Sequence, residues 1–268
     1  MENLKTAVEL AVGSGKALPF ACFSSVYEQR IANVPISRPL LVCVLDGCKQ
    51  LLGETEVTGE AGDFLLLSNH AALEMRNVPS GNGYRALLIE FEYEDFLPFI
   101  GKGRSRDKYL RGELSPLLSR TLTQFVEWAI WAPQHLWPLR RQEILHALWH
   151  EGFHQIGQMI EPPGLSHQIY NRLAANPASD PGSAELAAAL AMSESTLRRR
   201  LRQENTSLTT LRDQARLGVA LTLLQTTELP VAMVAERCGY QSHSRFTDRF
   251  RQTFGLTPSE LRKTRMTG

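Results

Sequence analysis

Residues 193–204 read SESTLRRRLRQE, and residues 242–253 read SHSRFTDRFRQT. Each stretch carries apolar side chains four residues apart, Leu197 and Leu201 in the first and Phe246 and Phe250 in the second. A four-residue step places two side chains on the same face of an α-helix. Both stretches therefore predict amphipathic helices, and the second repeats the first 49 residues further along the chain.

The repeat includes the helix expected before each stretch. Ala187 corresponds to Ala235 and Ala191 to Gly239, each pair 48 residues apart, so a one-residue slip falls in the turn. Each unit is a helix, a tight turn and a second helix, with a small residue where the helices cross, which is typical of a helix-turn-helix. Two copies joined by an amphipathic helix are far more specific than one. Helices are expected over residues 184–191, 195–204, 209–225, 231–238, 243–254 and 259–265.

Capping signals support these boundaries. Ser193 and Ser242 can cap the two repeated helices, and Pro230 suits the first turn of another. Gly239 and Gly255 suit left-handed helix exits. Residues 257–260, Thr-Pro-Ser-Glu, form a capping-box pattern.

The polar faces of the two helices repeat together with their apolar faces. At 100° per residue, three arginines and a serine lie opposite the apolar face of the first helix, and the same four angles of the second hold Thr, Arg, Ser and Asp. A single basic face on a helix is explained equally well by exposure to solvent and by DNA binding. Its repetition favours recognition helices, whose polar side chains reach base edges in the major groove. The candidate DNA-binding residues are Ser195, Arg198, Arg199, Arg202, His243, Ser244, Thr247, Asp248 and Arg251.

Two of these candidates leave alternatives open. Asp248 could accept a hydrogen bond from a cytosine amino group, orient Arg251 or Arg245, or exclude some bases. His243 could reach a phosphate or a base edge, or only cap its helix. Both residues make the second helix different in chemistry from the arginine-rich first one.

The net charge of +1 hides an uneven distribution along the 268 residues. Residues 1–165 hold 15 Lys and Arg against 19 Asp and Glu, whereas residues 166–268 hold 14 against 9. Thirteen of those 14 C-terminal cations are arginine, which suits phosphate and guanine. This asymmetry indicates a nucleic-acid partner for the C-terminal part. The composition is that of a folded globular chain, and its length suggests two domains.

The N-terminal part predicts short strands between turn residues, which is typical of an antiparallel barrel or jelly roll. We therefore expect an α+β chain in which a cupin-like β-barrel spans about residues 20–100 and accessory helices span about residues 113–158. The sequence leaves open whether these helices pack on the barrel or on a second subunit. Residues 161–166, which begin Glu-Pro-Pro-Gly, are the expected linker. They separate a regulatory or dimerisation domain (1–160) from a DNA-binding domain (167–268).

One enzyme-like motif competes with this interpretation. His150, Glu151 and His154 match HExxH, and two histidines four residues apart on a helix can bind zinc with the glutamate as general base. The position of a third ligand is Ile160, which cannot bind zinc, and Gly152 weakens the helix. We expect structural or surface histidines here, with His146 extending a stripe open to metal or protons as the alternative.

No other catalytic pattern stands out. His70 is alone at the place where metal-binding cupins carry an HxH, so we expect no metal, no catalytic residue and no cofactor. The four cysteines lack CxxC spacing and are expected to be free thiols, with a Cys43–Cys48 redox pair as the alternative. The N-terminus lacks a signal-peptide pattern, and no apolar run is long enough to span a membrane, so a cytoplasmic location is expected.

The C-terminal motifs resemble those of AraC/XylS-type transcription regulators. The resemblance rests on residues 216–224 (RLGVALTLL), 231–240 (VAMVAERCGY), 242–246 (SHSRF), 250–258 (FRQTFGLTP) and Leu261-Arg262, with residues 192–207 similar to the first recognition helix of that family. It implies that a linker helix holds two recognition helices in successive major-groove turns, about 34 Å apart. It also implies promoter DNA and RNA polymerase as partners, and transcriptional activation as the outcome.

The same resemblance implies that the N-terminal domain forms a homodimer or senses a signal, from a small-molecule effector or from a protein antagonist. An architectural or repressor protein without polymerase contact is the alternative function. The residues alone indicate a DNA-binding protein with two helix-turn-helix units and an acidic N-terminal domain.

Overall fold

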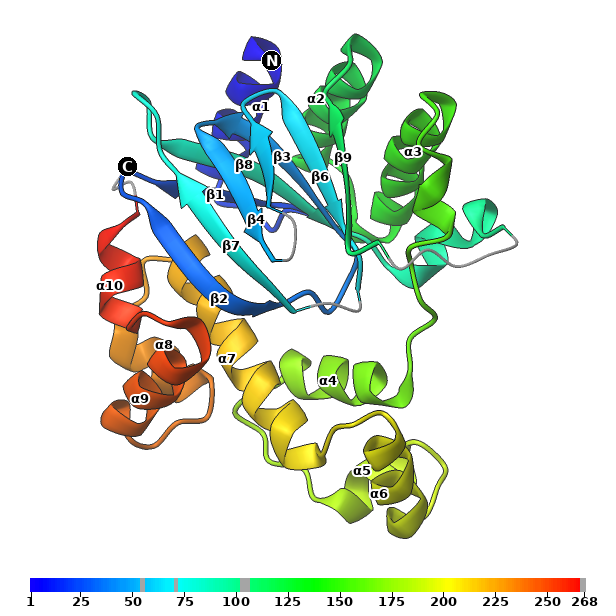
Figure 1. Cartoon of the computed structure of the whole chain (residues 1–268), viewed down its shortest axis with the longest axis vertical. Helices are drawn as coiled ribbons and strands as arrows, with labels where there is room; N and C mark the ends of the chain where they lie inside the picture. Colours follow the sequence, from blue (N-terminus) through cyan, green and yellow to red (C-terminus); the bar gives the residue numbers. More distant parts are fainter. Residues whose placement is uncertain (54–55, 70–71, 102–106, 266–268) are drawn as a thin grey trace. The chain divides into compact units, whose positions relative to one another are not determined.

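The computed structural model describes residues 1–53, 56–69, 72–101 and 107–265 (Figure 1). His70 lies outside these residues. The chain divides into two compact units. The first comprises Met1–Arg30, Arg38–Glu161 and the chain from Thr264, and the second comprises Ile31–Ser37 and Pro162–Lys263.

Two antiparallel sheets form the centre of the first unit. Strand β3 lies between β6 and β8 in the larger sheet, with Cys43 opposite both Phe64 and Leu87. The five-stranded sheet has the order β1 (Ala21–Ser25), β8 (Tyr84–Glu90), β3 (Leu40–Asp46), β6 (Asp63–Leu67) and β9 (Tyr109–Glu113). The four-stranded sheet has the order β2 (Gln29–Pro35), β7 (Ala72–Val78), β4 (Cys48–Leu52) and β5 (Val57–Glu60).

The described strands form two separate sheets, so the cupin-like barrel expected over about residues 20–100 is not confirmed. The α+β class is confirmed. Strands β1, β2, β5 and β9 were not among the predicted strands. These four strands carry more polar or half-buried residues, so their hydrophobic pattern is weak. One of them, β9, adds an edge to the larger sheet beyond the expected barrel.

Three helices of the first unit supply one core together with the larger sheet. The helices are α1 (Glu2–Gly13), α2 (Pro116–Ala129) and α3 (Trp137–His150), and three short 3-10 helices accompany them at Tyr93–Phe99 (η1), Gln134–Leu136 (η2) and His154–Gly157 (η3). Leu118, Leu122 and Phe125 of α2 are buried in this core together with Leu41 of β3 and Leu87 of β8. The accessory helices thus pack on the sheet of their own chain.

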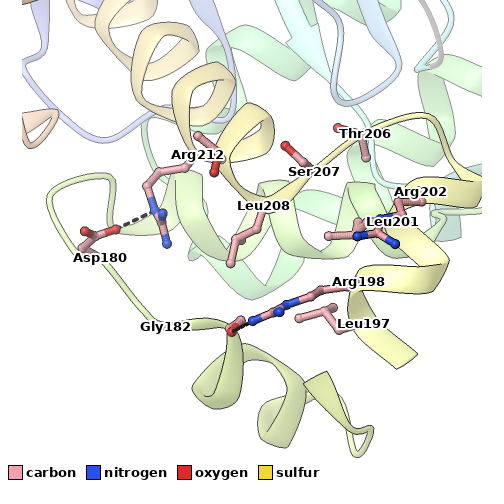
Figure 2. A pocket seen from close by; sticks show the side chains of 12 residues that line it. Asp180, Gly182, Leu197, Arg198, Leu201, Arg202, Thr206, Ser207, Leu208 and Arg212 are labelled. Atoms are coloured by element: carbon pink, nitrogen blue, oxygen red, sulfur yellow. Dashed lines mark hydrogen bonds and ion pairs between the residues drawn. The ribbon is translucent and has the colours of Figure 1, made fainter. Parts of the chain in front are cut away.

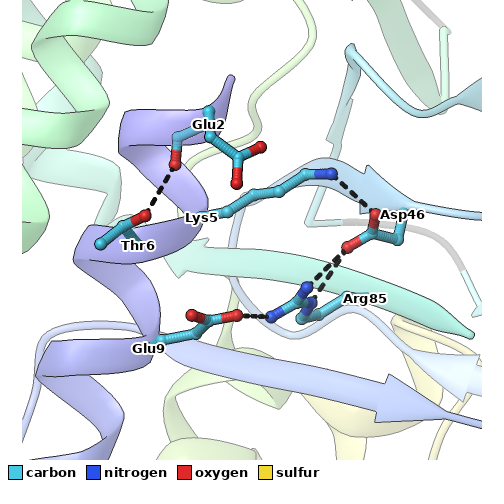
Figure 3. Close-up of polar contacts among 6 residues, drawn as sticks. All are labelled: Glu2, Lys5, Thr6, Glu9, Asp46 and Arg85. Carbon is cyan, nitrogen blue, oxygen red and sulfur yellow. Dashed lines mark hydrogen bonds and ion pairs between the residues drawn. The ribbon is translucent and has the colours of Figure 1, made fainter. Parts of the chain in front are cut away.

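Helix α1 was not predicted, although Leu4, Val8 and Ala11 follow a helical spacing and are buried. Charged side chains fasten it to the larger sheet (Figure 3). Lys5 Nζ lies 2.7 Å from Asp46 Oδ1, and Arg85 donates to the other oxygen of Asp46 at 3.0 Å. Because these polar partners are far away in the sequence, their pairing could not be read from it.

The second unit contains seven helices in its described residues. Six of them agree with the predicted ranges within about two residues, as expected for helix ends. They are α5 (Ser183–Ala189), α6 (Glu194–Gln203), α7 (Leu208–Thr226), α8 (Val231–Arg237), α9 (His243–Phe254) and α10 (Pro258–Lys263). The seventh, α4 (Leu165–Ala175), was not predicted and begins inside the expected linker.

The start of α4 is capped from a distance. Both carboxylate oxygens of Glu204 accept backbone N–H groups at this end, from Leu165 at 3.1 Å and from Ser166 at 2.8 Å. A carboxylate at a helix N-terminus satisfies donors that have no partner within the helix. Since the cap comes from another helix, the usual local capping signal is absent from the sequence before α4.

Helix α7 contributes to the packing of both helix-turn-helix units. Leu211 and Ala215 in its first half are buried with Ile169, Leu197 and Leu201. Its second half carries buried Leu221 and Leu224 and contacts α8 and α10. Figure 1 shows α5 and α6 beside one end of α7, and α8, α9 and α10 beside the other end. The predicted linker helix is thus part of both cores.

The two turns of the repeated units share a left-handed residue. Ala191 has φ of 51° and its counterpart Gly239 has φ of 78°. A Cβ on Gly239 would lie 2.9 Å from the backbone oxygen of Pro177 and 3.1 Å from Arg216 Nε, whose guanidinium donates to the same oxygen at 3.0 Å. Glycine at 239 therefore allows the second turn to approach residues 177–178, which lie between α4 and α5.

Replacement of Gly239 by Ala should destabilise the chain more than replacement of Gly255. Both glycines are left-handed, but nothing lies within 4 Å of a Cβ on Gly255. Gly255→Ala should therefore lower the free energy of unfolding only by the strain of a left-handed alanine, about 1–2 kcal/mol. Gly239→Ala should cost at least about 1 kcal/mol more, because the added methyl group meets backbone atoms. Urea unfolding of both full-length variants measures the difference, and equal losses would show that the close approach does not matter.

Candidate nucleic-acid interface

Helix α6 has one buried and one exposed face. Leu197 is 0 % and Leu201 is 2 % exposed, and both belong to the core of the first helix-turn-helix. The hydroxyl of Ser193 accepts the backbone N–H of Thr196 at 3.2 Å, which confirms the predicted cap. The four candidates on the opposite face are exposed, and they are Ser195, Arg198, Arg199 and Arg202.

Helix α9 is anchored by a column of aromatic rings. Phe246 and Phe250 have ring centroids 5.7 Å apart, and Phe250 and Phe254 have theirs 4.7 Å apart. All three side chains are at most 1 % exposed. The opposite face presents His243, Ser244, Asp248 and Arg251 as exposed residues and Thr247 as a half-buried one.

The structure bears on two of the alternatives, helix capping by His243 and ion pairing of Asp248 with a neighbouring arginine. The hydroxyl of Ser242, and not His243, provides the cap by accepting the backbone N–H of Arg245 at 3.3 Å. Asp248 has no ion pair with either neighbouring arginine, 245 or 251, among the described residues. Its carboxylate is exposed on the same face as the other candidates.

Several C-terminal arginines form polar contacts within the second unit. Arg249 of α9 forms an ion pair with Asp213 of α7. Arg212 Nε lies 2.6 Å from Asp180 Oδ1, and Arg216 donates to the Pro177 oxygen. The positive balance of residues 166–268 therefore overstates the charge available to DNA. The sequence gave no signal for these pairs, because each joins an arginine to a residue more than 30 positions away.

The first recognition helix already has polar contacts within its own unit. Arg198 lies 3.3 Å from Glu194 and 3.5 Å from the hydroxyl of Ser183. Arg199 and Arg202 make no ion pair among the residues that the structure describes. Of the three candidate arginines of α6, Arg199 and Arg202 are thus the two that no carboxylate of the described residues holds.

Burial explains the state of the cysteine in this unit. Cys238 is buried at the end of α8, and burial raises the pKa of its thiol to about 12. Such a thiol stays protonated near neutral pH and is unreactive. All four cysteines of the chain are free, so Cys43 and Cys48 are not joined by a disulfide.

The HExxH stretch does not form the helix that a zinc site of this kind needs. Helix α3 ends at His150, Gly152 follows with φ of 93°, and a 3-10 helix begins at His154. The two histidines therefore do not face the same side of one helix. Glu151 accepts a hydrogen bond from the hydroxyl of Ser115.

Two of the three histidines, His146 and His154, pack against aromatic rings. The ring of His146 lies 4.8 Å from that of Phe99, and the ring of His154 lies 4.6 Å from that of Trp149. Across the described ranges there is no group of three or more His, Cys, Asp or Glu residues that could hold a metal ion. Over the same ranges no helix combines the length and the apolar character needed to cross a membrane.

Comparison with known proteins identifies the second unit. A family model described as a helix-turn-helix domain matches residues 186–264. The urease operon transcriptional activator of Escherichia coli is 37 % identical over 78 residues, which are 29 % of this chain and 26 % of the relative. The HTH-type transcriptional regulator GadX of E. coli K12 is 32 % identical over 130 residues, 47 % of each protein. The chain spans about a quarter to a half of the length of the curated relatives it matches.

The fold of nearly the whole chain, including the N-terminal unit, is similar to that of solved structures. The structure of an apo variant of ToxT from Vibrio cholerae superposes with a TM-score of 0.66 at 14 % identity, covering 94 % of this chain and 99 % of that one. A second ToxT structure, with a bound unsaturated fatty acid, gives a TM-score of 0.61 at 14 % identity and covers 93 % of this chain and 95 % of that one. At this identity the likeness concerns the fold.

These relatives are transcriptional regulators and not enzymes. The matched domain contains both repeated helix pairs and the exposed faces of α6 and α9. Residues 186–264 therefore form a helix-turn-helix domain of the AraC type, similar to the domains of these transcriptional regulators.

Proposed function

We propose that the chain activates transcription by reading two successive major-groove segments of promoter DNA with α6 and α9. The observation that carries this proposal is the repeated pair of helices, each buried by Leu or Phe on one side and exposed with polar side chains on the other. The nine candidate residues at positions 195, 198, 199, 202, 243, 244, 247, 248 and 251 supply the contacts to bases and phosphates. The activity takes place in the cytoplasm, where the promoter is accessible.

Activation requires contact with RNA polymerase. The name of the urease operon activator, whose matching region is 37 % identical, supports this role. An architectural or repressor protein would bind the same promoter without recruiting polymerase. In vitro transcription on the footprinted promoter distinguishes the two, because only an activator increases transcript synthesis by purified polymerase.

We propose residues 1–160 as a regulatory and dimerisation domain, residues 161–166 as the junction and residues 167–268 as the DNA-binding domain. The two sheets of the regulatory domain are an open variant of the cupin-like barrel. Its effector is an apolar carboxylic acid, as supported by the fatty acid bound to the structurally similar ToxT. A protein antagonist is the alternative input.

A buried lysine supports a carboxylate ligand. The side chain of Lys49 on β4 is only 3 % exposed and donates to Asn77 Oδ1 at 2.8 Å. Asn77 in turn donates to Gln29 Oε1 at 3.1 Å. Lys49 has no ion pair among the described residues, and burial lowers its pKa to about 7. A ligand carboxylate would supply the negative charge that a buried ammonium group needs.

The Arg199→Ala variant tests base reading by α6. Loss of a guanidinium that contacts a base should cost about 1–3 kcal/mol on the cognate site and relax specificity at one position. Arg200→Ala is the matched control, because Arg200 is also exposed but lies on the side of α6 that faces Leu165 and Glu204. Fluorescence anisotropy on cognate and scrambled duplexes measures both variants. If Arg199→Ala and Arg200→Ala weaken binding equally on both duplexes, α6 does not read bases through Arg199.

Binding of a fatty acid should depend on pH through Lys49. The ammonium group is charged below a pKa of about 7, whereas the ligand carboxylate stays ionised from pH 6 to pH 8.5. The affinity for monomeric oleic acid should therefore fall by about tenfold or more between these two values. Isothermal titration of the full chain measures it.

The Lys49→Met variant should bind oleic acid weakly and equally at both pH values. Lys108→Met, which removes an exposed lysine of the same unit, should retain the pH dependence of the wild type. Tight binding by Lys49→Met, or wild-type affinity that does not change with pH, would contradict the role of Lys49.

A further inference from the structure

A cavity lies in the DNA-binding unit, directly beside the recognition helix α6. Its volume is about 540 Å³, it is open to solvent, and it is lined by the start of α5, the side of α6 and the start of α7 (Figure 2). Three guanidinium groups line it, those of Arg198, Arg202 and Arg212. A volume of this order is typical of sites for small molecules and far exceeds that of one phosphate.

The charges and dipoles around the cavity favour an anion. Asp180 is the only carboxylate in its described lining, and it is paired with Arg212 at 2.6 Å. Ser207 and Thr209 add hydroxyl groups at the start of α7. The first turn of α7 contains no acidic residue, so the positive end of its dipole is not neutralised there.

The second helix-turn-helix lacks these features at the equivalent place. Its counterparts of Arg198 and Arg202, 49 residues further on, are Thr247 and Arg251, so one cation is missing. Glu260 occupies the first turn of α10 and accepts the backbone N–H of Thr257 at 2.7 Å. The repeat thus provides an internal comparison in which only the first unit combines several arginines with a helix start free of carboxylates.

We infer that this cavity binds a small phosphorylated anion, and that the bound anion competes with DNA for Arg198 and Arg202. Arginine binds phosphate oxygens through two parallel hydrogen bonds, and three such groups line this cavity. The apolar floor, with Leu201 and Leu208, accommodates an organic part of the ligand. The second half of this inference rests on the proposed DNA-reading role of α6.

The contacts of Arg198 in the free protein leave it available to a bound anion, which would then compete with DNA for its guanidinium group. Its guanidinium is held loosely, 3.3 Å from Glu194 and 3.5 Å from Ser183. A phosphate in the cavity would turn Arg198 and Arg202 towards itself through shorter, charge-assisted hydrogen bonds. Both side chains would then be withdrawn from the groove-reading face.

Inorganic pyrophosphate is the probe for this site, with the full chain and with potassium chloride used to match ionic strength. Isothermal titration should show saturable binding with one site per chain. In anisotropy measurements, pyrophosphate should raise the Kd for the cognate duplex by about fivefold or more beyond the effect of ionic strength alone.

Two variants place the same negative charge at equivalent positions of the two units. Thr209→Glu adds a carboxylate to the cavity at the second residue of α7, and Ser259→Glu adds one at the second residue of α10. Both positions are exposed and favour acidic side chains, so both variants should fold, which urea unfolding checks. Thr209→Glu should weaken pyrophosphate binding by at least about tenfold through repulsion, whereas Ser259→Glu should bind it like the wild type.

Absence of saturable binding, equal binding by Thr209→Glu and wild type, or binding that leaves the DNA affinity unchanged would overturn the inference. Failure of the proposed function gives a different result, because the wild type would then not bind its duplex even without pyrophosphate. Specific DNA binding that is insensitive to pyrophosphate overturns only the anion site.

Discussion

The arrangement of the DNA-binding unit depends on the burial of α7 in two cores. The first half of this helix is buried with α4 and α6, and its second half contacts α8 and α10. The first helix-turn-helix thus shares a core with α7, and the second contacts it through α8. The distance and rotation between α6 and α9 are consequently fixed by side-chain packing along one helix, and not by a flexible connection.

Polar contacts add to this packing at the middle of α7. Arg216 donates to the backbone oxygen of Pro177 between α4 and α5, and Gly239 of the second helix-turn-helix approaches the same oxygen closely enough to exclude a side chain. Arg249 and Asp213 join α9 to α7. The C-terminal arginines therefore do not form one basic surface: some make polar contacts within the DNA-binding unit, and others are exposed on α6 and α9.

The features that could be predicted from the sequence are the local and periodic ones. The buried faces of α6 and α9 repeat with a fixed offset, and their caps, Ser193 and Ser242, directly precede them, so both helices could be predicted with their exposed residues. Helix α4 could not, because its cap, Glu204, is 38 or 39 positions away. The sheets were harder still, since strand pairing is non-local and a weakly patterned strand such as β9 acquires its place only from its neighbour β6. The cavity beside α6 could not be predicted for the same reason. Arg198 and Arg202 were predicted as exposed residues, but Arg212 and the start of α7 line the same cavity only because of the turn between α6 and α7.

The central claim is that α7 holds α6 and α9 rigidly, so that one chain reads two segments of the same DNA face. The most direct measurement is the affinity of the full chain for its footprinted site before and after insertion of five base pairs between the two segments. Half a helical turn moves the second segment to the opposite face of the duplex, so a rigid pair should lose about tenfold or more in affinity. Unchanged affinity would show that the two helices bind independently and would contradict the account.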